Sequence, residues 1–372
     1  MKGNGAAGGL EGVVAADTRL SEVDGERGRL ILAGHDVETL AGRVTFEDAC
    51  ALLWRGALPD RAGRETLRAA LADARQAAFA RLGDLGDALG ADDGMDALRA
   101  ALAHLRLRDD DPAAVTGAAA VFAAAWARGR AGQAPVAPDA ALAHAADYLR
   151  MARGDATAAP PPTLAGALDA YLVTVCDHGL NASTFAARVV ASTASDLVSA
   201  VVAAVGALKG PLHGGAPGPV LDMLDAVGAP ARARAWLESE LAAGRRIMGM
   251  GHRIYRVRDP RAAVLEAAVE RLERAAADAG AEVAPIAARL ALARAVEREA
   301  EAVLKARHPD RALRANVEFY TAVVLEAVGL PRPLFTPTFA VSRVAGWCAH
   351  VLEQRATGRL IRPASRYVGP RP

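Results

Sequence analysis

Residues 247–262 read IMGMGHRIYRVRDPRA, and no other stretch says more about the architecture of this chain. A Gly-Met-Gly loop leads into five basic or imidazole side chains, at positions 252, 253, 256, 258 and 261. Guanidinium groups match the oxygens of phosphates and carboxylates, so the cluster predicts a site for a polyanionic ligand. Asp259 followed by Pro260 also predicts the start of a helix. A solvated basic loop before that helix is the simpler interpretation, and the two are compatible.

Two further segments place a histidine beside residues that interrupt helices. In DHGLNASTFAARV, residues 177–189, the polar residues at 181, 183 and 184 can cap a helix that starts near Phe185. His178 then lies just outside a helix N-terminus, where anions bind, although a capped helix with an exposed histidine is equally compatible. In ALKGPLHGGAP, residues 207–217, a proline and a glycine pair enclose His213 in a sharp turn between apolar helices. A plain turn does not need histidine, so the context favours a functional His213.

A carboxylate and two arginines complete the set. In NVEFYTAVV, residues 316–324, Glu318 is a surface residue, a buried charge with a partner, or a base. Arg343 lies in the apolar AVSRVAGWC, where a charge is costly unless paired. Arg362 precedes a proline in an extended tail that suits an arm reaching a partner. Without a nucleophile and matched base, or a dinucleotide or phosphate loop, the inventory favours proton abstraction beside a carbonyl over hydrolase or dehydrogenase chemistry.

Composition sets the broad class. The chain has 372 residues, a length that predicts two domains, or one large domain with a smaller one packed on it. It is 52% hydrophobic and only 4% aromatic, and its abundant alanine predicts a mainly α fold. A net charge of +1 argues against a nucleic-acid partner. Cys50, Cys176 and Cys348 show neither zinc-site spacing nor a disulfide framework, which fits a cytoplasmic protein without metal. No secretory signal is visible, and the apolar run 113–126 predicts a buried helix, not a membrane span.

Local patterns predict the elements. Apolar stretches at 12–16 and 30–33 flank EVDGERG at 22–28, where Asp24-Gly25 is a hairpin signal, so a small β-hairpin is expected near the N-terminus. Thr45 and Asp48 predict a capping box. Helices are expected between residues 60 and 150 and over 262–307, with the Pro-rich 154–163 as a connector.

Six motifs in order resemble the citrate synthase family: DHGLNAST, GALKGPLHGGA, GMGHRIYRVRDPRA, NVEFY, SRVAGW and RLIRPASRYVGP. The resemblance is dense from about residue 164 to 370 and thinner before that. It implies a mostly α-helical homodimer whose large domain is built from 1–213 and 324–372, the latter ending in an arm, with a small domain over 214–323. The two domains would close over acetyl-CoA and oxaloacetate, which condense before the thioester is hydrolysed. No metal and no permanently bound cofactor are expected.

The resemblance also implies individual roles. His213 would donate a hydrogen bond to the thioester oxygen as the enolate forms, and His252 would polarise and protonate the oxaloacetate ketone. Glu318 would remove the methyl proton. The oxaloacetate carboxylates would be held by His178, Arg261, Arg343 and, from the other subunit, Arg362. CoA would be met by Gly249, Gly251, Arg256 and Arg258.

Two positions depart from the family pattern. Glu318 stands where the family more often has Asp; the intrinsic pKa differs little, so reach changes more than basicity. A displacement of about 1 Å can cost roughly a hundredfold in rate, so the backbone has to compensate. Ala33 stands where many members carry an arginine. Two alternatives stay open: a 2-methylcitrate synthase using propionyl-CoA, which shares every motif, and a non-catalytic binding or assembly protein, which only Glu318 favours.

Overall fold

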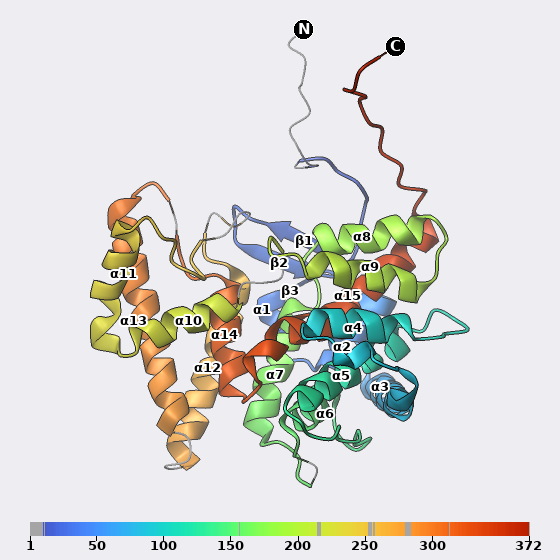
Figure 1. Cartoon of the computed structure of the whole chain (residues 1–372), viewed down its shortest axis with the longest axis horizontal. Helices are drawn as coiled ribbons and strands as arrows, with labels where there is room; N and C mark the ends of the chain where they lie inside the picture. The colour runs from blue at the N-terminus through green and yellow to red at the C-terminus, as the bar shows by residue number, and fades with distance from the viewer. Residues whose placement is uncertain are drawn as a thin grey trace.

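The computed structural model describes residues 10–371 except 11, 156, 214–216, 252–254, 256, 280–283 and 312. The chain is mostly helical with a small antiparallel sheet near its N-terminus (Figure 1), which confirms the predicted fold class. The strands are β1 (Ser21–Asp24), β2 (Arg29–Leu32) and β3 (His35–Asp36). The first helices are α1 (Val37–Leu40), α2 (Phe46–Arg55), α3 (Arg61–Ala80), α4 (Gly94–Ala103), α5 (Pro112–Arg130), α6 (His144–Arg153), α7 (Pro162–Val175) and α8 (Ala182–Ser192). The others are α9 (Leu197–Leu208), α10 (Pro217–Val227), α11 (Ala233–Ala242), α12 (Pro260–Ala279), α13 (Ala284–Arg307), α14 (Val317–Ala327) and α15 (Phe335–Thr357).

The sheet differs in detail from the predicted hairpin. Its first strand is β1, not the apolar stretch at 12–16, and Asp24 pairs with Arg29, so the connection has four residues instead of a two-residue turn at Asp24-Gly25. Strand β3 was not predicted. It pairs with β2 across Ala33 and Gly34, whose φ angles of 44° and 89° suit a two-residue hairpin turn. Alanine rarely adopts a positive φ, so the sequence carried no clear signal for this turn.

The helical predictions hold at the positions that shape the core. Thr45 and Asp48 form the predicted capping box of α2. Residues 113–126 lie in α5 and are almost all buried, as expected of a helix that is apolar on every side. Helix α5 packs against α3, α4, α6 and α15, and small residues allow close approach: a Cβ on Gly117 would lie 2.6 Å from that of Ala74. In the described part of the chain, no helix is both long and apolar enough to cross a membrane.

Helix α7 is the element around which the later helices meet. It packs against α12, α14 and α15. Gly346 of α15 lies so close to the end of α7 that a Cβ there would overlap the Cys176 carbonyl oxygen. Arg343, one turn earlier on α15, is thereby brought to the C-terminus of α7.

Helices α10, α11 and α13 gather on one side of the molecule, with α12 and α14 between them and α7 (Figure 1). The predicted domain boundary at residue 323 falls inside α14, which runs without a break from Val317 to Ala327. A boundary at either end of α14 fits the helix better, and the division into two domains stays a prediction.

Candidate active site

His178 lies in the loop between α7 and α8, and the start of α8 fixes one end of this loop. Asn181 is the N-cap: its side-chain oxygen accepts the backbone N–H groups of Ser183 and Thr184, each at 3.1 Å. Its amide nitrogen donates back to the Gly179 carbonyl at 3.3 Å. His178 therefore lies just before a capped helix N-terminus, as predicted, and it is buried.

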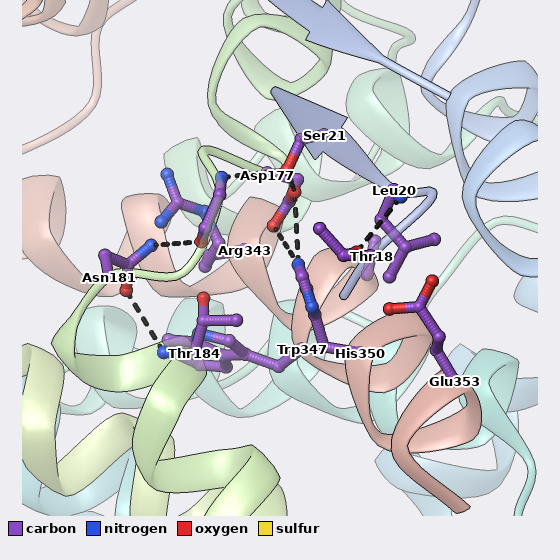
Figure 2. A network of polar contacts seen from close by, with 12 residues as sticks. Thr18, Leu20, Ser21, Asp177, Asn181, Thr184, Arg343, Trp347, His350 and Glu353 are labelled. Atoms are coloured by element: carbon purple, nitrogen blue, oxygen red, sulfur yellow. Dashed lines mark hydrogen bonds and ion pairs between the residues drawn. The ribbon is translucent and has the colours of Figure 1, made fainter. Parts of the chain in front are cut away.

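The N-terminal sheet fixes the other end of the loop. Ser21 of β1 donates its hydroxyl to the Asp177 carboxylate and accepts the Gly179 N–H at 2.9 Å (Figure 2). Both contacts flank His178 in the sequence. The small sheet thus holds the backbone on each side of the histidine.

Asp177 also ends a buried network that continues onto α15 (Figure 2). His350 Nε2 lies 3.2 Å from the Asp177 carboxylate, and His350 Nδ1 accepts from Arg188 Nε at 2.9 Å. Arginine only donates, so the His350 proton is on Nε2 and faces Asp177. Burial alone would raise the pKa of Asp177, but His350 and the Arg343 guanidinium hold that pKa below its usual value.

Tyr255 connects His178 to Arg261. The tyrosine hydroxyl lies 3.1 Å from His178 Nε2, with the two rings edge to face at 5.8 Å between centroids. The Arg261 guanidinium carbon lies 5.7 Å from the centre of the Tyr255 ring, within range of a cation–π contact. All three side chains are buried.

Asp259 fixes Arg261 and joins two helix starts. Arg261 donates Nε to Oδ1 at 3.0 Å and Nη2 to Oδ2 at 2.8 Å, a two-pronged ion pair. The same carboxylate accepts the backbone N–H of Arg261 at 3.0 Å, the predicted cap of α12, and that of Val317 at 3.3 Å. The first turns of α12 and α14 therefore share one buried anion.

Arg343 is a buried cation of a different kind. Its Nε donates to the Val175 carbonyl at 2.7 Å, at the end of α7 where helix carbonyls lack intrahelical partners, and its guanidinium lies 4.6 Å from the centre of the Phe339 ring. Within the described residues, no carboxylate lies at ion-pair distance from it. Burial lowers its pKa to about 10, although Asp177 opposes this shift. A buried cation without an anion is costly, so Arg343 predicts an anionic ligand.

His213 is held as a neutral imidazole by Ser183. Its Nε2 lies 2.8 Å from the serine hydroxyl and accepts the Ser183 backbone N–H at 3.3 Å, while Trp347 donates to the same hydroxyl at 3.2 Å. Nε2 is therefore an acceptor, and the proton resides on Nδ1. Burial lowers the pKa of His213 and Arg343 lowers it further, so the ring is uncharged at neutral pH. It can offer Nδ1–H as a hydrogen-bond donor.

Glu318 lies in the first turn of α14, and the Gly-Met-Gly loop positions that turn. Asn316 caps the helix by accepting the Glu318 N–H at 2.9 Å. The loop in turn holds Asn316: the Gly249 carbonyl accepts its backbone N–H at 2.9 Å and the Gly251 carbonyl accepts its side-chain amide at 2.7 Å. Gly249 and Gly251 have φ angles of 72° and 79°, so both conformations favour glycine.

The charge state of Glu318 is balanced near neutrality. Although part of the side chain remains exposed, its removal from water raises its pKa to about 7; Arg261 opposes this shift, Asp259 adds to it, and Arg343 opposes it. Across the ranges that the structure describes, its carboxylate makes neither a hydrogen bond nor an ion pair. A carboxylate with a pKa near 7 is well matched to accept a proton at physiological pH.

Five of the residues singled out in the sequence therefore share one region: His178, His213, Arg261, Glu318 and Arg343. Arg343 is close enough to influence the pKa of both His213 and Glu318. Arg261 also influences the pKa of Glu318. Tyr255 joins His178 to Arg261. His252 and Arg256 lie outside the described residues.

Two predicted arginines lie elsewhere. Arg258 pairs with Glu266 and, at 3.8 Å, with Glu297, so this chain's own carboxylates surround it. Arg362 is exposed in the extended tail after α15 (Figure 1) and is not part of the cluster. Sequence reasoning missed Ser183 as the partner of His213, Tyr255 as a link and Asp259 as a tie between helices, because only tertiary contacts reveal these roles.

A basic hollow adjoins the segment that precedes Glu318. It has a volume of about 590 Å³, and its lining includes four basic residues, Arg298, Lys305, Arg311 and Arg314, and two acidic ones, Glu301 and Asp310. Among the described residues, neither Lys305, Arg311 nor Arg314 has a carboxylate at ion-pair distance. Among all the residues that the structure describes, no group of three or more His, Cys, Asp or Glu side chains could hold a metal ion.

The same chain matches a family model described as "Citrate synthase, C-terminal domain" over residues 9–364. The chain belongs to the citrate synthase family. The members of this family are acyltransferases, and the match spans every element of the site.

Individual citrate synthase family members match over nearly the whole chain. The citrate synthase of Haloferax volcanii is 38% identical over 379 residues, covering 97% of this chain and 95% of that protein. The 2-methylcitrate synthase of Mycobacterium tuberculosis is 36% identical over 382 residues, covering 97% and 90%. The crystal structure of citrate synthase from Thermotoga maritima superposes with a TM-score of 0.80 at 33% identity and covers 98% of this chain and 96% of that one.

Proposed function

We propose that this family member is a citrate synthase, which condenses acetyl-CoA with oxaloacetate and hydrolyses the resulting citryl-CoA to citrate and CoA. One observation carries the proposal. Glu318, a carboxylate with a pKa of about 7, and His213, a neutral imidazole with a donor on Nδ1, both lie within the electrostatic reach of the buried Arg343. Glu318 then serves as the base, His213 as the hydrogen-bond donor to the oxyanion, and Arg343 as the binding site for an anion.

Glu318 and His213 carry out separate parts of the enolisation. Glu318 takes a proton from the methyl group of acetyl-CoA, and the electron pair left on carbon delocalises onto the thioester oxygen. His213 donates Nδ1–H to that oxygen, and because the ring is already neutral it stabilises the enolate without competing for the proton. The enolate carbon then attacks the ketone carbon of oxaloacetate, whose oxygen we assign to His252 for polarisation and protonation.

Oxaloacetate brings two carboxylates, and the region offers cations for them. Arg343 lacks a carboxylate partner in the described part of the chain. The charge of Arg261 acts on Arg343, and Tyr255 links Arg261 to His178. We assign Arg362 to the site of a second subunit. Its extended tail exposes Leu360, Tyr367 and Val368, which are 57%, 64% and 83% accessible, and such apolar side chains favour cover by a partner. Closure of two domains over the substrates would exclude water from the enolate.

The CoA phosphates fit the basic hollow better than Arg258. The hollow offers Lys305, Arg311 and Arg314, whereas Arg258 is engaged with Glu266. Part of its lining, up to Arg314, comes just before Asn316 in the sequence, so a pantetheine arm would run from the hollow toward Glu318. Gly249 and Gly251 support the helix carrying Glu318, a role that the sequence did not suggest, and contact with CoA stays a proposal for them and for Arg256.

Thiol release tests the function directly. The chain is incubated with oxaloacetate and either acetyl-CoA or propionyl-CoA, and free CoA is followed with a thiol reagent. A higher kcat/KM for acetyl-CoA supports citrate synthase. A higher value for propionyl-CoA favours 2-methylcitrate synthase, the activity that names one 36% identical relative. Release from neither, with oxaloacetate still bound, favours a non-catalytic binding or assembly protein.

The pH dependence of condensation follows from Glu318. The base acts only as a carboxylate, and the ionised fraction increases as pH rises through its pKa of about 7. We expect kcat/KM to fall tenfold for each pH unit below that value and to level off above it. A rate profile between pH 5.5 and 9 measures this. A flat profile down to pH 5.5 contradicts the assignment of Glu318 as the base.

The Gly-Met-Gly loop gives a second expectation, because Gly249 packs against the first turn of α14. A Cβ at this position would lie 2.9 Å from the Phe319 Cβ, at a φ of 72°. Gly249→Ala should therefore displace Glu318, and a shift of about 1 Å lowers kcat roughly a hundredfold. Gly244→Ala is the matched control: its φ is 74°, and a Cβ there meets nothing within 4 Å. Equal loss of kcat in both variants would leave the loop without a positioning role.

A further inference from the structure

Tyr171 lies on α7 and does not appear in the chemistry above. Its side chain is fully buried, and its hydroxyl has no hydrogen-bond partner among the described residues. Leaving a buried hydroxyl unpaired is costly, so such a group in a native fold needs an explanation. Its position offers one, because α7 packs against the three helices that carry Arg261, Glu318 and Arg343.

Tyr171 lies one turn before the end of α7 that meets that cluster. Tyr171 and Val175 are four residues apart on α7 and so share one face of the helix. Val175 is the residue whose backbone carbonyl accepts Arg343 Nε, so the end of α7, one turn beyond Tyr171, meets the site. Besides burial, the charges that act on the hydroxyl are those of Glu318 on α14, Arg343 on α15, Tyr148 on α6 and Arg261 on α12.

One of these four neighbours is a carboxylate, which is the strongest acceptor for the phenol proton. Arg261 and Arg343 are donors only. The Tyr148 hydroxyl is already engaged with Thr338 Oγ1 at 2.7 Å. Glu318 remains, and in the described part of the chain its carboxylate is itself without a hydrogen bond. A donor without a partner among the described residues is therefore within electrostatic reach of an acceptor without one, and the glutamate side chain has the torsional freedom to meet a phenol that packing holds in place.

We propose that Tyr171 is a positioning residue for the base: its hydroxyl donates to the Glu318 carboxylate when the substrates fill the site. This inference rests on the proposed function. The hydrogen bond would direct one carboxylate oxygen, leave the other for the methyl proton, and stabilise the ionised form of Glu318. It would also help a glutamate act where the family more often has the shorter aspartate, since the extra methylene is folded back toward α7.

The Tyr171→Phe variant removes only the hydroxyl. A hydrogen bond to a carboxylate lowers the pKa of that group by about 1, so the acidic limb of kcat should move to higher pH by about that amount in the variant. We expect kcat at the optimum to fall roughly tenfold, as the base loses its orientation, while KM for oxaloacetate changes by less than about twofold. Full pH profiles of kcat and KM for both proteins measure this.

Tyr148→Phe is the matched control, because it removes a buried hydroxyl that already has a partner away from the site. It should lower the melting temperature and leave the pH profile of kcat unchanged. A Tyr171→Phe profile that overlays the parent overturns the proposal, as does a rise in KM for oxaloacetate with no shift of the limb, which would assign the hydroxyl to the substrate. A parent without condensation activity is a different result and overturns the proposed function instead.

Discussion

Glu318→Gln is expected to lower the rate of citrate formation about a thousandfold while oxaloacetate binds as in the parent. The amide keeps the size of the side chain but cannot take a proton, and a positioned general base contributes on the order of 10²–10⁴ in rate. The carboxylate has no structural partner within the described residues, so the change leaves no buried ion unpaired. Thiol release measures the rate, and titration calorimetry with oxaloacetate measures binding.

Glu326→Gln is the control for this result. It makes the same chemical change near the other end of α14, where Glu326 pairs with Arg289 and Arg332, and surface pairs of this kind contribute little. Glu318→Asp should lie between parent and Gln variant, about a hundredfold below the parent, because the backbone here is set for the longer side chain. If Glu318→Gln stays within tenfold of the parent, another group is the base.

Arg343→Met is expected to weaken oxaloacetate binding about a thousandfold, with a much smaller effect on the stability of the ligand-free protein. Losing a buried, hydrogen-bonded charge partner costs about 2–5 kcal/mol, or roughly 30- to 4000-fold in affinity. The buried guanidinium meets a carbonyl and a ring but, among the described residues, no carboxylate. Replacing it by an apolar side chain of similar length removes a buried charge but leaves the Val175 carbonyl without this donor, so the two effects on folding oppose each other. Calorimetry measures affinity, and thermal unfolding measures stability.

The thermal experiment separates the two effects. Oxaloacetate should raise the melting temperature of the parent, because a ligand that binds only the folded state stabilises it, and should no longer do so in Arg343→Met. Arg355→Met, further along the same helix and paired with Asp110, is the control and should keep the ligand-dependent shift. Unchanged oxaloacetate affinity in Arg343→Met would remove this residue from the binding site.

The features that were predictable from the sequence are those with local causes. The cap of α12 at Asp259, the capping box at Thr45 and the buried α5 each follow from a few adjacent residues. The turn before β3 was missed because Ala33 adopts a conformation that alanine rarely takes. Ion-pair partners are also non-local: Arg258 belongs to a basic run in the sequence, yet in the fold it meets Glu266 on α12.

In the candidate site, too, the residues with a local signal were predictable and those defined by tertiary contacts were not. His178, His213, Glu318 and Arg343 were noticed because a histidine or a charge interrupts an apolar pattern. Tyr171 and His350 were not, since a tyrosine or histidine on an apolar helix looks like an ordinary core residue. Their meaning comes only from what surrounds them. The Tyr171 hydroxyl has no hydrogen-bond partner among the described residues and feels the charge of Glu318, and His350 meets the Asp177 carboxylate.

The most direct measurement of Glu318 as the base follows the methyl protons of acetyl-CoA by proton NMR in D₂O. Malate is added in place of oxaloacetate, because it offers the same two carboxylates but no ketone, so enolisation can occur without condensation. We predict that the parent exchanges the methyl protons for deuterium and that Glu318→Gln does not. A parent that binds both ligands without exchange, or equal exchange by the two proteins, would contradict the claim that Glu318 takes the proton.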